Sequence, residues 1–210
     1  MNLFLKKRAI LSCKKHMSYT EITGQPCAGK SSFMNREKSN NEAIVFKQGI
    51  ARKIFYFLCG LYFLNLSRSK VLFFWSMLEQ APLYFRINIF FNAVSKFGIF
   101  FYLQSSSANN HEDILVDEGI SHLPFLFLNS DTIKVVDFIS NELQQTNVHY
   151  LNSPGSGLIE QRLTIRGHKR LNFLLLSAFV NRINEIEHNL LSEYPKLCKQ
   201  FKVFEDAASI

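Results

Sequence analysis

The chain has 210 residues, which is enough for one α/β domain with a full core but not for two ordinary domains. A composition that is 47% hydrophobic and 20% charged is typical of a globular protein and excludes a disordered chain. The net charge of +7 favours an anionic ligand. Because the basic residues are spread along the chain, nucleic acid is not an expected partner.

Cysteine spacing and apolar segments both bear on location. The most apolar segments lie at 54–66, 71–78 and 87–103. The first two are shorter than the ~18 residues that span a bilayer, and the third contains Lys96. Buried helices of a cytoplasmic protein are therefore expected, with contact at a membrane surface as the alternative. The cysteines show no CxxC pair and no metal-ligand spacing, which indicates free thiols, and they are Cys13, Cys27, Cys59 and Cys198.

Residues 1–16 carry five basic residues around short apolar stretches and lack a signal-type apolar core. They are expected to form a basic extension, and residues 17–210 to form the domain. In chain order we expect a strand at 19–23, a helix at 31–39, a strand at 43–47, three helices within 50–104, a strand at 114–117, a helix at 132–143, a strand at 148–151, helices at 158–170 and 171–191, and a strand at 201–204.

Alternation of strands and helices is typical of an α/β domain whose parallel sheet is covered by helices on both faces, in three layers. The helical block 50–104 lies between the second and third strands. Such an insertion is expected to build the pocket for a second substrate.

A glycine-rich motif with the spacing GxxxxGK[ST] follows the first predicted strand and opens a helix. The glycines let successive N–H groups point at phosphate oxygens, Lys30 reaches the outer phosphates, and the Ser31 hydroxyl binds Mg²⁺. The alternative is an ordinary glycine turn. The expected nucleotide-binding residues are Gly24, Gln25, Pro26, Cys27, Ala28, Gly29, Lys30, Ser31 and Ser32.

Two acids, Asp117 and Glu118, end the apolar run that begins at Ile114. An acid at the end of a strand beside such a loop holds magnesium or activates a nucleophile, so Asp117 is a candidate metal ligand and both acids are candidate catalytic residues. The alternative is that Asp117 caps the next helix. His122 and the segment 111–113 do not have the spacing of metal ligands.

Three arginines, Arg162, Arg166 and Arg170, recur every four residues on one predicted helical face. Phosphoryl transfer spreads negative charge over the equatorial oxygens, and arginines on a closing segment can neutralise it. The alternative is a solvated basic face.

An aromatic block surrounds Arg86 within the helical insertion. Aromatic residues at helical spacing most often form a core, and an arginine buried among them needs an anionic partner. We expect Arg86 to bind the acceptor's phosphate or carboxylate, and the alternative partner is Glu79. The aromatic residues are Trp75, Tyr84, Phe85, Phe90 and Phe91.

Four segments together resemble the thymidylate-kinase-like P-loop kinases, in particular the small predicted kinases of bacterial polysaccharide-synthesis clusters. They are GQPCAGKSS at 24–32, LVDEGISH at 115–122, LIEQRLTIRGHKR at 158–170 and FKVFEDAAS at 201–209. The resemblance implies a five-stranded parallel sheet in the order 2-3-1-4-5. It also implies that Lys30 and Ser31 bind the donor phosphates and magnesium, that Asp117 lies near the acceptor, and that the three arginines belong to a lid.

The same resemblance places the loop 206–209 near the adenine. Thymidylate kinases carry Asp-Arg-Tyr where this chain has Asp117-Glu118-Gly119. The missing arginine disfavours thymidylate as the acceptor. The chain also stops at Ile210, where the family continues into a further helix.

The sequence therefore predicts a phosphotransferase that uses ATP and Mg²⁺ on a small acceptor held by the insertion. A P-loop ATPase, or a regulatory nucleotide-binding module without small-molecule transfer, is the second hypothesis. A membrane-surface protein that uses its aromatic helices is the third. A homodimer is left open, and the sequence does not name the acceptor.

Overall fold

The computed structural model describes residues 19–39, 44–45, 50–105, 114–153, 155–166 and 175–205. The basic extension 1–16, Arg170 and the loop 206–209 lie outside these described residues, and so do predictions that concern them.

Parallel strands form one sheet in the order β2-β3-β1-β4-β5. The edge strand β2 contributes only Ile44–Val45, so four longer strands make the body of the sheet. The prediction of an α/β chain with an all-parallel sheet is confirmed, and the strand order is the one expected. The four longer strands are β1 (Tyr19–Gly24), β3 (Ile114–Asp117), β4 (Asn147–Leu151) and β5 (Gln200–Phe204).

Strand register brings the candidate site together. Ile22 of β1 pairs with Asp117 of β3, and Gly24 of β1 pairs with Leu151 of β4. The carboxyl ends of three neighbouring strands therefore meet at one edge of the sheet, where parallel sheets bind ligands.

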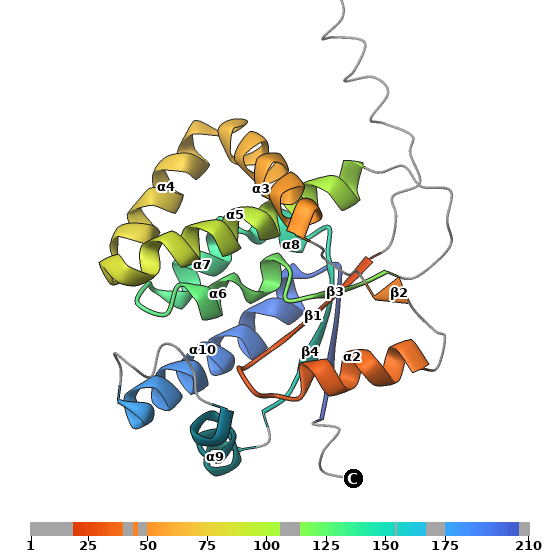
Figure 1. The fold of residues 1–210 in the computed structure, drawn as a ribbon, viewed down its shortest axis with the longest axis vertical. Helices are drawn as coiled ribbons and strands as arrows, with labels where there is room; N and C mark the ends of the chain where they lie inside the picture. The colour runs from red at the N-terminus through yellow and green to blue at the C-terminus, as the bar shows by residue number, and fades with distance from the viewer. Residues whose placement is uncertain are drawn as a thin grey trace, which may run out of the picture.

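Side chains alternate between the two faces along each strand, so both faces of the sheet carry apolar residues, and helices cover both of them. Leu115 and Leu151 pack with Phe33 in a small core beneath α2 (Lys30–Ser39). Val116 and Tyr150 point to the other face and join the main core. Figure 1 shows α2 on one side of the sheet and α6, α7, α10 and the insertion on the other. The helices thus form the two outer layers.

Helices after β3 differ from the predicted ones in three places. The predicted helix 132–143 is two helices, because the backbone leaves the helical conformation at Ile139 (φ −103°, ψ 7°). The last helix continues past the predicted end at 191, because its buried apolar stripe continues to Tyr194. The segment 120–126 carried no prediction and is helical. These helices are η2 (Ile120–His122, a 3₁₀ helix), α6 (Leu123–Leu126), α7 (Thr132–Phe138), α8 (Ser140–Leu143), α9 (Ser156–Arg166) and α10 (Leu176–Leu197).

Three helices form the insertion, as predicted: α3 (Ile50–Asn65), α4 (Arg68–Glu79) and α5 (Leu83–Ser105). Glycines let α3 and α5 pack backbone to backbone. A Cβ on Gly60 would lie 1.9 Å from the Val94 carbonyl oxygen, and one on Gly98 would lie 1.7 Å from that of Tyr56. Any larger residue at either position would push the two helices apart.

The described helices are short for the thickness of a bilayer or are interrupted by polar residues. None of them alone has both the length and the apolar character to cross a bilayer. The pair α3–α4 meets those criteria jointly, but the two helices are bent by 115° relative to each other.

The aromatic block of the insertion is only partly core, which corrects the sequence-based expectation. Phe85 is buried, at 7% exposure, and Phe90 is partly buried. Trp75, Tyr84 and Phe91 are exposed by 50%, 75% and 51%. A helix that is apolar on all sides does not indicate which side will face the core, so the sequence could not separate these residues.

Candidate functional site

The loop between β1 and α2 is built on three residues with positive φ, namely Gly24 (148°), Cys27 (67°) and Gly29 (85°). Glycine adopts such values freely, whereas Cys27 does so at a cost. A Cβ on Gly24 would also lie 2.5 Å from the Leu151 carbonyl oxygen. The spacing of the two glycines is therefore required by the shape of the loop.

Backbone donors are open at the end of this loop. The N–H of Ala28 donates to Gln25, and that of Phe33 donates to Gly29. Because Lys30 is the first residue of α2, the N–H groups of Lys30 and the two serines after it lie in the first turn, where no carbonyl of the helix can accept them. The positive end of the helix dipole points the same way. This geometry suits an anion.

Lys30 is buried and lies across the loop. Its Nζ donates to the carbonyl oxygens of Gly24 (3.1 Å) and Gln25 (2.8 Å) and forms an ion pair with Glu118 (3.2 Å). Ser31 and Ser32, by contrast, are exposed. The Lys30 ammonium thus lies across the loop, and the two serines that follow it in α2 are open to solvent.

Gln25 ties the loop to α10. Its amide nitrogen donates to Asn184 Oδ1 (3.0 Å) and to Glu187 Oε2 (2.7 Å). The other oxygen of Glu187 accepts from the Tyr150 hydroxyl on β4 (3.0 Å). Sequence reasoning missed Glu187, because an acid on an amphipathic helix gives no signal that distinguishes it from a solvated one.

Beside the loop, β3 ends in the two predicted acids. Glu118 has a positive φ of 53°, and its N–H donates to the Ile22 carbonyl oxygen on β1 (3.0 Å). Burial favours the neutral form of Glu118, but attraction by His122, Lys96 and Lys30 outweighs it and holds the pKa of this carboxyl well below its usual range. Glu118 is therefore an anion at neutral pH.

The pKa of Asp117 is shifted in the opposite direction to that of Glu118. Its side chain reaches solvent, yet the protein packed around it raises its pKa, and repulsion by Glu118 raises the pKa further, against the attraction of Lys30 and Lys96. Two neighbouring carboxyls with pKa values pushed apart suit one fixed anion and one group that can exchange a proton.

A buried carboxylate, Glu21, fixes the turn that carries these acids. It accepts the N–H groups of Ile120 (3.1 Å) and Ser121 (2.8 Å). Gly119 makes this approach possible, since a Cβ there would lie 2.1 Å from the Glu21 carboxylate. Burial raises the pKa of Glu21, and the two N–H bonds oppose that shift. The sequence gives no signal for this role, because Glu21 lies between threonines in a strand of mixed polarity.

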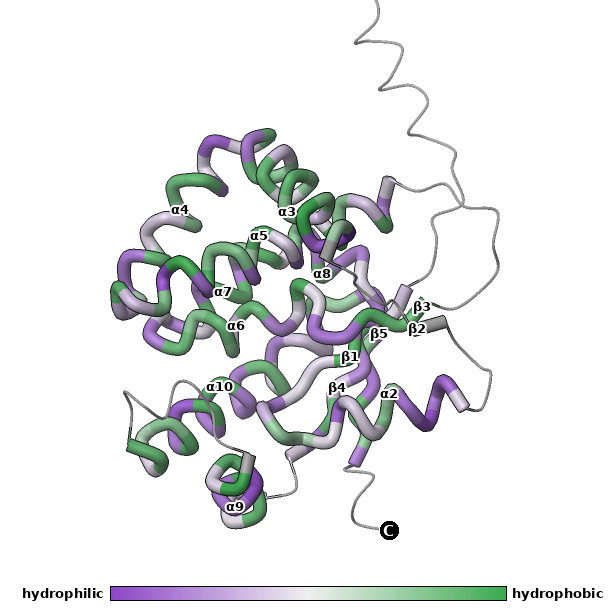
Figure 2. The backbone as a smooth tube through the Cα atoms, viewed as in Figure 1, coloured by the Kyte–Doolittle hydropathy of each residue, from purple (hydrophilic) through white to green (hydrophobic). Residues whose placement is uncertain are grey.

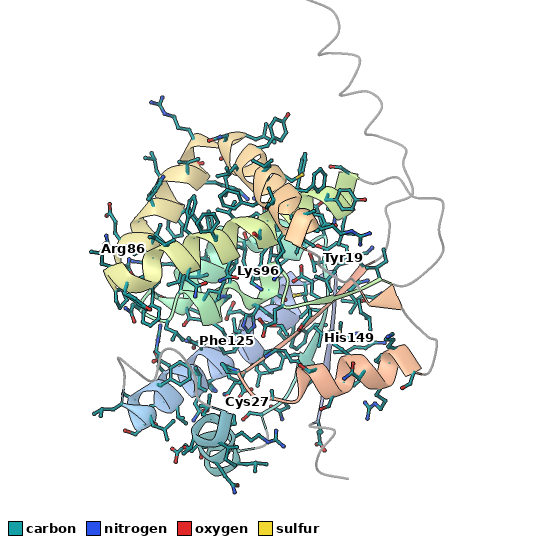
Figure 3. All side chains as sticks on the ribbon, in the orientation of Figure 1. Tyr19, Cys27, Arg86, Lys96, Phe125 and His149 are labelled. Atoms are coloured by element: carbon teal, nitrogen blue, oxygen red, sulfur yellow. The ribbon has the colours of Figure 1, made fainter. Side chains whose placement is uncertain are left out.

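Two further residues join the cluster from elsewhere in the chain. His122 places Nε2 3.5 Å from Glu118 Oε1 and Nδ1 3.3 Å from the Thr23 hydroxyl. Lys96, on α5 of the insertion, donates to the Glu118 carbonyl oxygen, and burial lowers its pKa despite the nearby carboxylates. Figure 3 shows Lys96 directed from α5 toward the sheet. Neither residue had a predicted role at this site: Lys96 only interrupted an apolar segment, and His122 lacked the spacing of a metal ligand.

Of the three arginines predicted to form a lid, the structure describes the side chain of one. Arg162 of α9 donates to the Cys27 carbonyl oxygen (2.9 Å), so α9 does contact the loop. The side chain of Arg166 lies outside the described residues, as does all of Arg170.

Arg86 does not lie at this site, which corrects the expectation that it contacts the acceptor there. Its guanidinium donates to the backbone carbonyl oxygens of Ala81 (2.9 Å) and Glu79 (2.7 Å), so it caps the corner between α4 and α5. Figure 3 shows it at the edge of the molecule, far from Cys27 and Lys96. Carbonyl oxygens at a helix end supply the partner that the sequence pattern left open.

Comparison with known proteins adds no information about the site. No protein-family model matches the chain, and no curated protein matches it. Within the described residues, no group of three or more His, Cys, Asp or Glu side chains could hold a metal ion alone. The geometry is a tight loop at a helix N-terminus, with the Lys30 ammonium across it and beside it two acids whose pKa values are shifted in opposite directions.

Proposed function

We propose that this chain is an ATP-dependent phosphotransferase of the P-loop kinase type that acts on a small acceptor. The carrying observation is the position of Lys30, between the loop carbonyls and Glu118, at the open N-terminus of α2. The residues present fit a nucleoside triphosphate, because the open N–H groups of the first turn of α2 and the Lys30 ammonium converge where the β- and γ-phosphates would lie. Ser31 and Asp117 are the proposed magnesium ligands, and the bound ion would neutralise charge on the phosphates.

Each residue then has a distinct task. Lys30 leaves Glu118 for the phosphate oxygens, and Arg162, already at the Cys27 carbonyl, supplies positive charge from α9. Asp117 takes the proton from the acceptor hydroxyl as that oxygen bonds to the phosphorus and the bond to ADP breaks. Lys96 replaces Arg86 as the proposed cation on the acceptor side, because it reaches this cluster from the insertion.

An ATPase is the second candidate, favoured by one specific contact. Glu118 is an anion directed at Lys30 (3.2 Å), where a second acid can polarise an attacking water. A phosphotransferase needs an acceptor for full turnover, whereas an ATPase does not. ADP release measured with and without pools of sugars, nucleosides and their phosphates separates the two candidates.

The loop assignment is tested by nucleotide binding. A ligand that binds only the folded state adds about 2.7 kcal/mol to the unfolding free energy when its concentration is a hundred times its Kd. Mg-ATP should therefore raise the melting temperature of the wild type, and Lys30→Ala should remove most of that rise. Lys38→Ala, an exposed lysine on the same helix, is the matched control and should keep it. An unchanged response in Lys30→Ala would exclude the loop as a phosphate site.

The chemical step is tested at Asp117. Asp117→Asn should bind Mg-ATP nearly as well as the wild type, because the aspartate acts on the proton and metal more than on nucleotide affinity, but it should abolish ADP release. Normal turnover in this variant would leave Asp117 with a structural role only.

A further inference from the structure

Exposed apolar side chains are concentrated on the helical insertion. A continuous surface, which we call the apolar face, carries Ile54 and Leu58 on α3, Trp75 on α4, and Tyr84, Ile87 and Phe91 on α5. Each of these side chains is exposed by 50% or more. Figure 2 shows the corresponding hydrophobic colour along α3, α4 and α5, on the side of the molecule away from α9 and the C-terminal end. Exposed apolar surfaces of this kind mark interaction sites.

Ring contacts join the three helices into one surface. Phe91 lies 4.7 Å from Phe57 of α3 and 5.8 Å from Phe90, and Phe90 stacks on Trp75 of α4 at 5.9 Å, all between ring centroids. The opposite sides of these helices are already buried, as Tyr56 and Phe74 show. The apolar face is therefore available to a partner while the domain stays folded.

Charge indicates the partner. Residues 50–105 contain six lysines and arginines but a single acid, Glu79. Lys70, Arg86 and Lys96 bond to Glu142 or to backbone carbonyl oxygens, so the exposed basic side chains of the insertion are Arg52, Lys53 and Arg68. Lys53 at the start of α3 and Arg68 at the start of α4 are both exposed. A basic excess around exposed tryptophan and tyrosine is the composition that seeks the headgroup region of an anionic bilayer.

We propose that the apolar face docks onto the surface of a bilayer that contains anionic lipid. The aromatic side chains insert at headgroup level, and Lys53 and Arg68 contact lipid phosphates. In Figure 3 Cys27 of the loop lies on the far side of the molecule from α4, so the docked protein keeps its nucleotide loop open to water. Docking is independent of the proposed phosphotransfer, and either can fail alone.

Trp75 is the only tryptophan of the chain, so its emission reports on the apolar face directly. The full chain is titrated with phosphatidylcholine vesicles, with or without about 30 mol% phosphatidylserine. We expect a blue shift of the Trp75 emission, quenching by lipids brominated on the acyl chain, and binding at least about tenfold tighter to the anionic vesicles.

Variants assign the binding to the surface. The double variant Tyr84→Ser/Phe91→Ser should weaken binding at least about tenfold, and Lys53→Gln/Arg68→Gln should remove most of the preference for phosphatidylserine. Ile165→Ser/Leu175→Ser, which changes two residues that are 79% exposed outside the insertion, is the matched control and should bind as the wild type does. Circular dichroism confirms that each variant is folded.

Three results would overturn the proposal. The first is an unchanged Trp75 emission with both kinds of vesicle. The second is undiminished binding by Tyr84→Ser/Phe91→Ser. The third is a dimer in sedimentation that this double variant dissociates while vesicles have no effect, because a second copy of the chain would then cover the apolar face.

Discussion

Gly119→Ala offers a sharp test of how the candidate site is held. Gly119 has an extended backbone with a negative φ (φ −68°, ψ −150°), so the substitution chiefly tests the space available to one methyl group. The new Cβ would lie 2.1 Å from the Glu21 carboxylate, inside any real contact distance. The Glu21 carboxylate must move away by roughly 1 Å, because the backbone of the buried strand β1 that carries it cannot shift.

Its retreat breaks the bonds to the N–H groups of Ile120 and Ser121, now 3.1 and 2.8 Å long. A hydrogen bond to a charged group contributes about 1.5–3 kcal/mol, so losing one or both costs about 2–4 kcal/mol. Replacing glycine by alanine restricts the unfolded chain and returns only about 0.4–1 kcal/mol. The loss of the hydrogen bonds dominates, and we expect a net destabilisation of at least about 1 kcal/mol.

Urea unfolding followed by circular dichroism measures this change. Gly157→Ala is the matched control, because a Cβ there meets nothing within 4 Å, and it should leave stability unchanged or raise it slightly. Gly119→Ala should also weaken the response to Mg-ATP, since the turn that positions Asp117 moves. A Gly119→Ala protein as stable as the control would refute the role assigned to Glu21.

Further predictions concern the insertion, the sheet and the loop anchor. Gly98→Ala should lower the free energy of unfolding in urea by at least about 2 kcal/mol, because the new Cβ would lie 1.7 Å from an α3 carbonyl oxygen. The better helix propensity of alanine offsets only part of this loss. An unchanged stability would mean that α3 and α5 can move apart freely. Burial, aided by Lys202, lowers the pKa of His149 to about 4, so the unfolded chain takes up a proton first as pH falls below about 6.5. Unfolding free energy should drop by about 1–2 kcal/mol from pH 7 to 4 after solvent screening, and His149→Gln should flatten that slope; parallel pH profiles would contradict this. Glu187→Ala and Tyr150→Phe should be non-additive by about 1 kcal/mol in a double-mutant cycle of urea unfolding, because their side chains share a hydrogen bond, whereas additive effects would show that the anchor contributes nothing.

Local patterns in the sequence determined the loop and the sheet. The spacing from Gly24 to Ser31 specifies a strand, a tight turn and a helix N-terminus within eight neighbouring residues, so no distant contact is needed to predict it. Alternation of apolar strands with helices indicates a parallel sheet, and parallel strands bring their carboxyl ends to one edge. Asp117 could be placed beside Lys30 on that basis alone.

Tertiary structure alone decided which other groups complete the site. Glu21, Lys96, His122 and Glu187 come from separate elements, and each looks in the sequence like an ordinary polar residue on a strand or helix. Their convergence depends on long-range packing, which one-dimensional spacing does not record.

The same limit explains the two errors in the insertion. Arg86 could pair with an anion, a side chain or a helix end, and only the corner between α4 and α5 selects the carbonyl oxygens. Trp75 and Phe91 lie on helices that are apolar around most of their circumference, so the periodicity of apolar residues did not indicate which side of each helix faces the core. Which aromatic residues became core and which formed the apolar face was decided by where α3 and α4 fold back over α5, because burial is a property of the packed helices and not of any one of them.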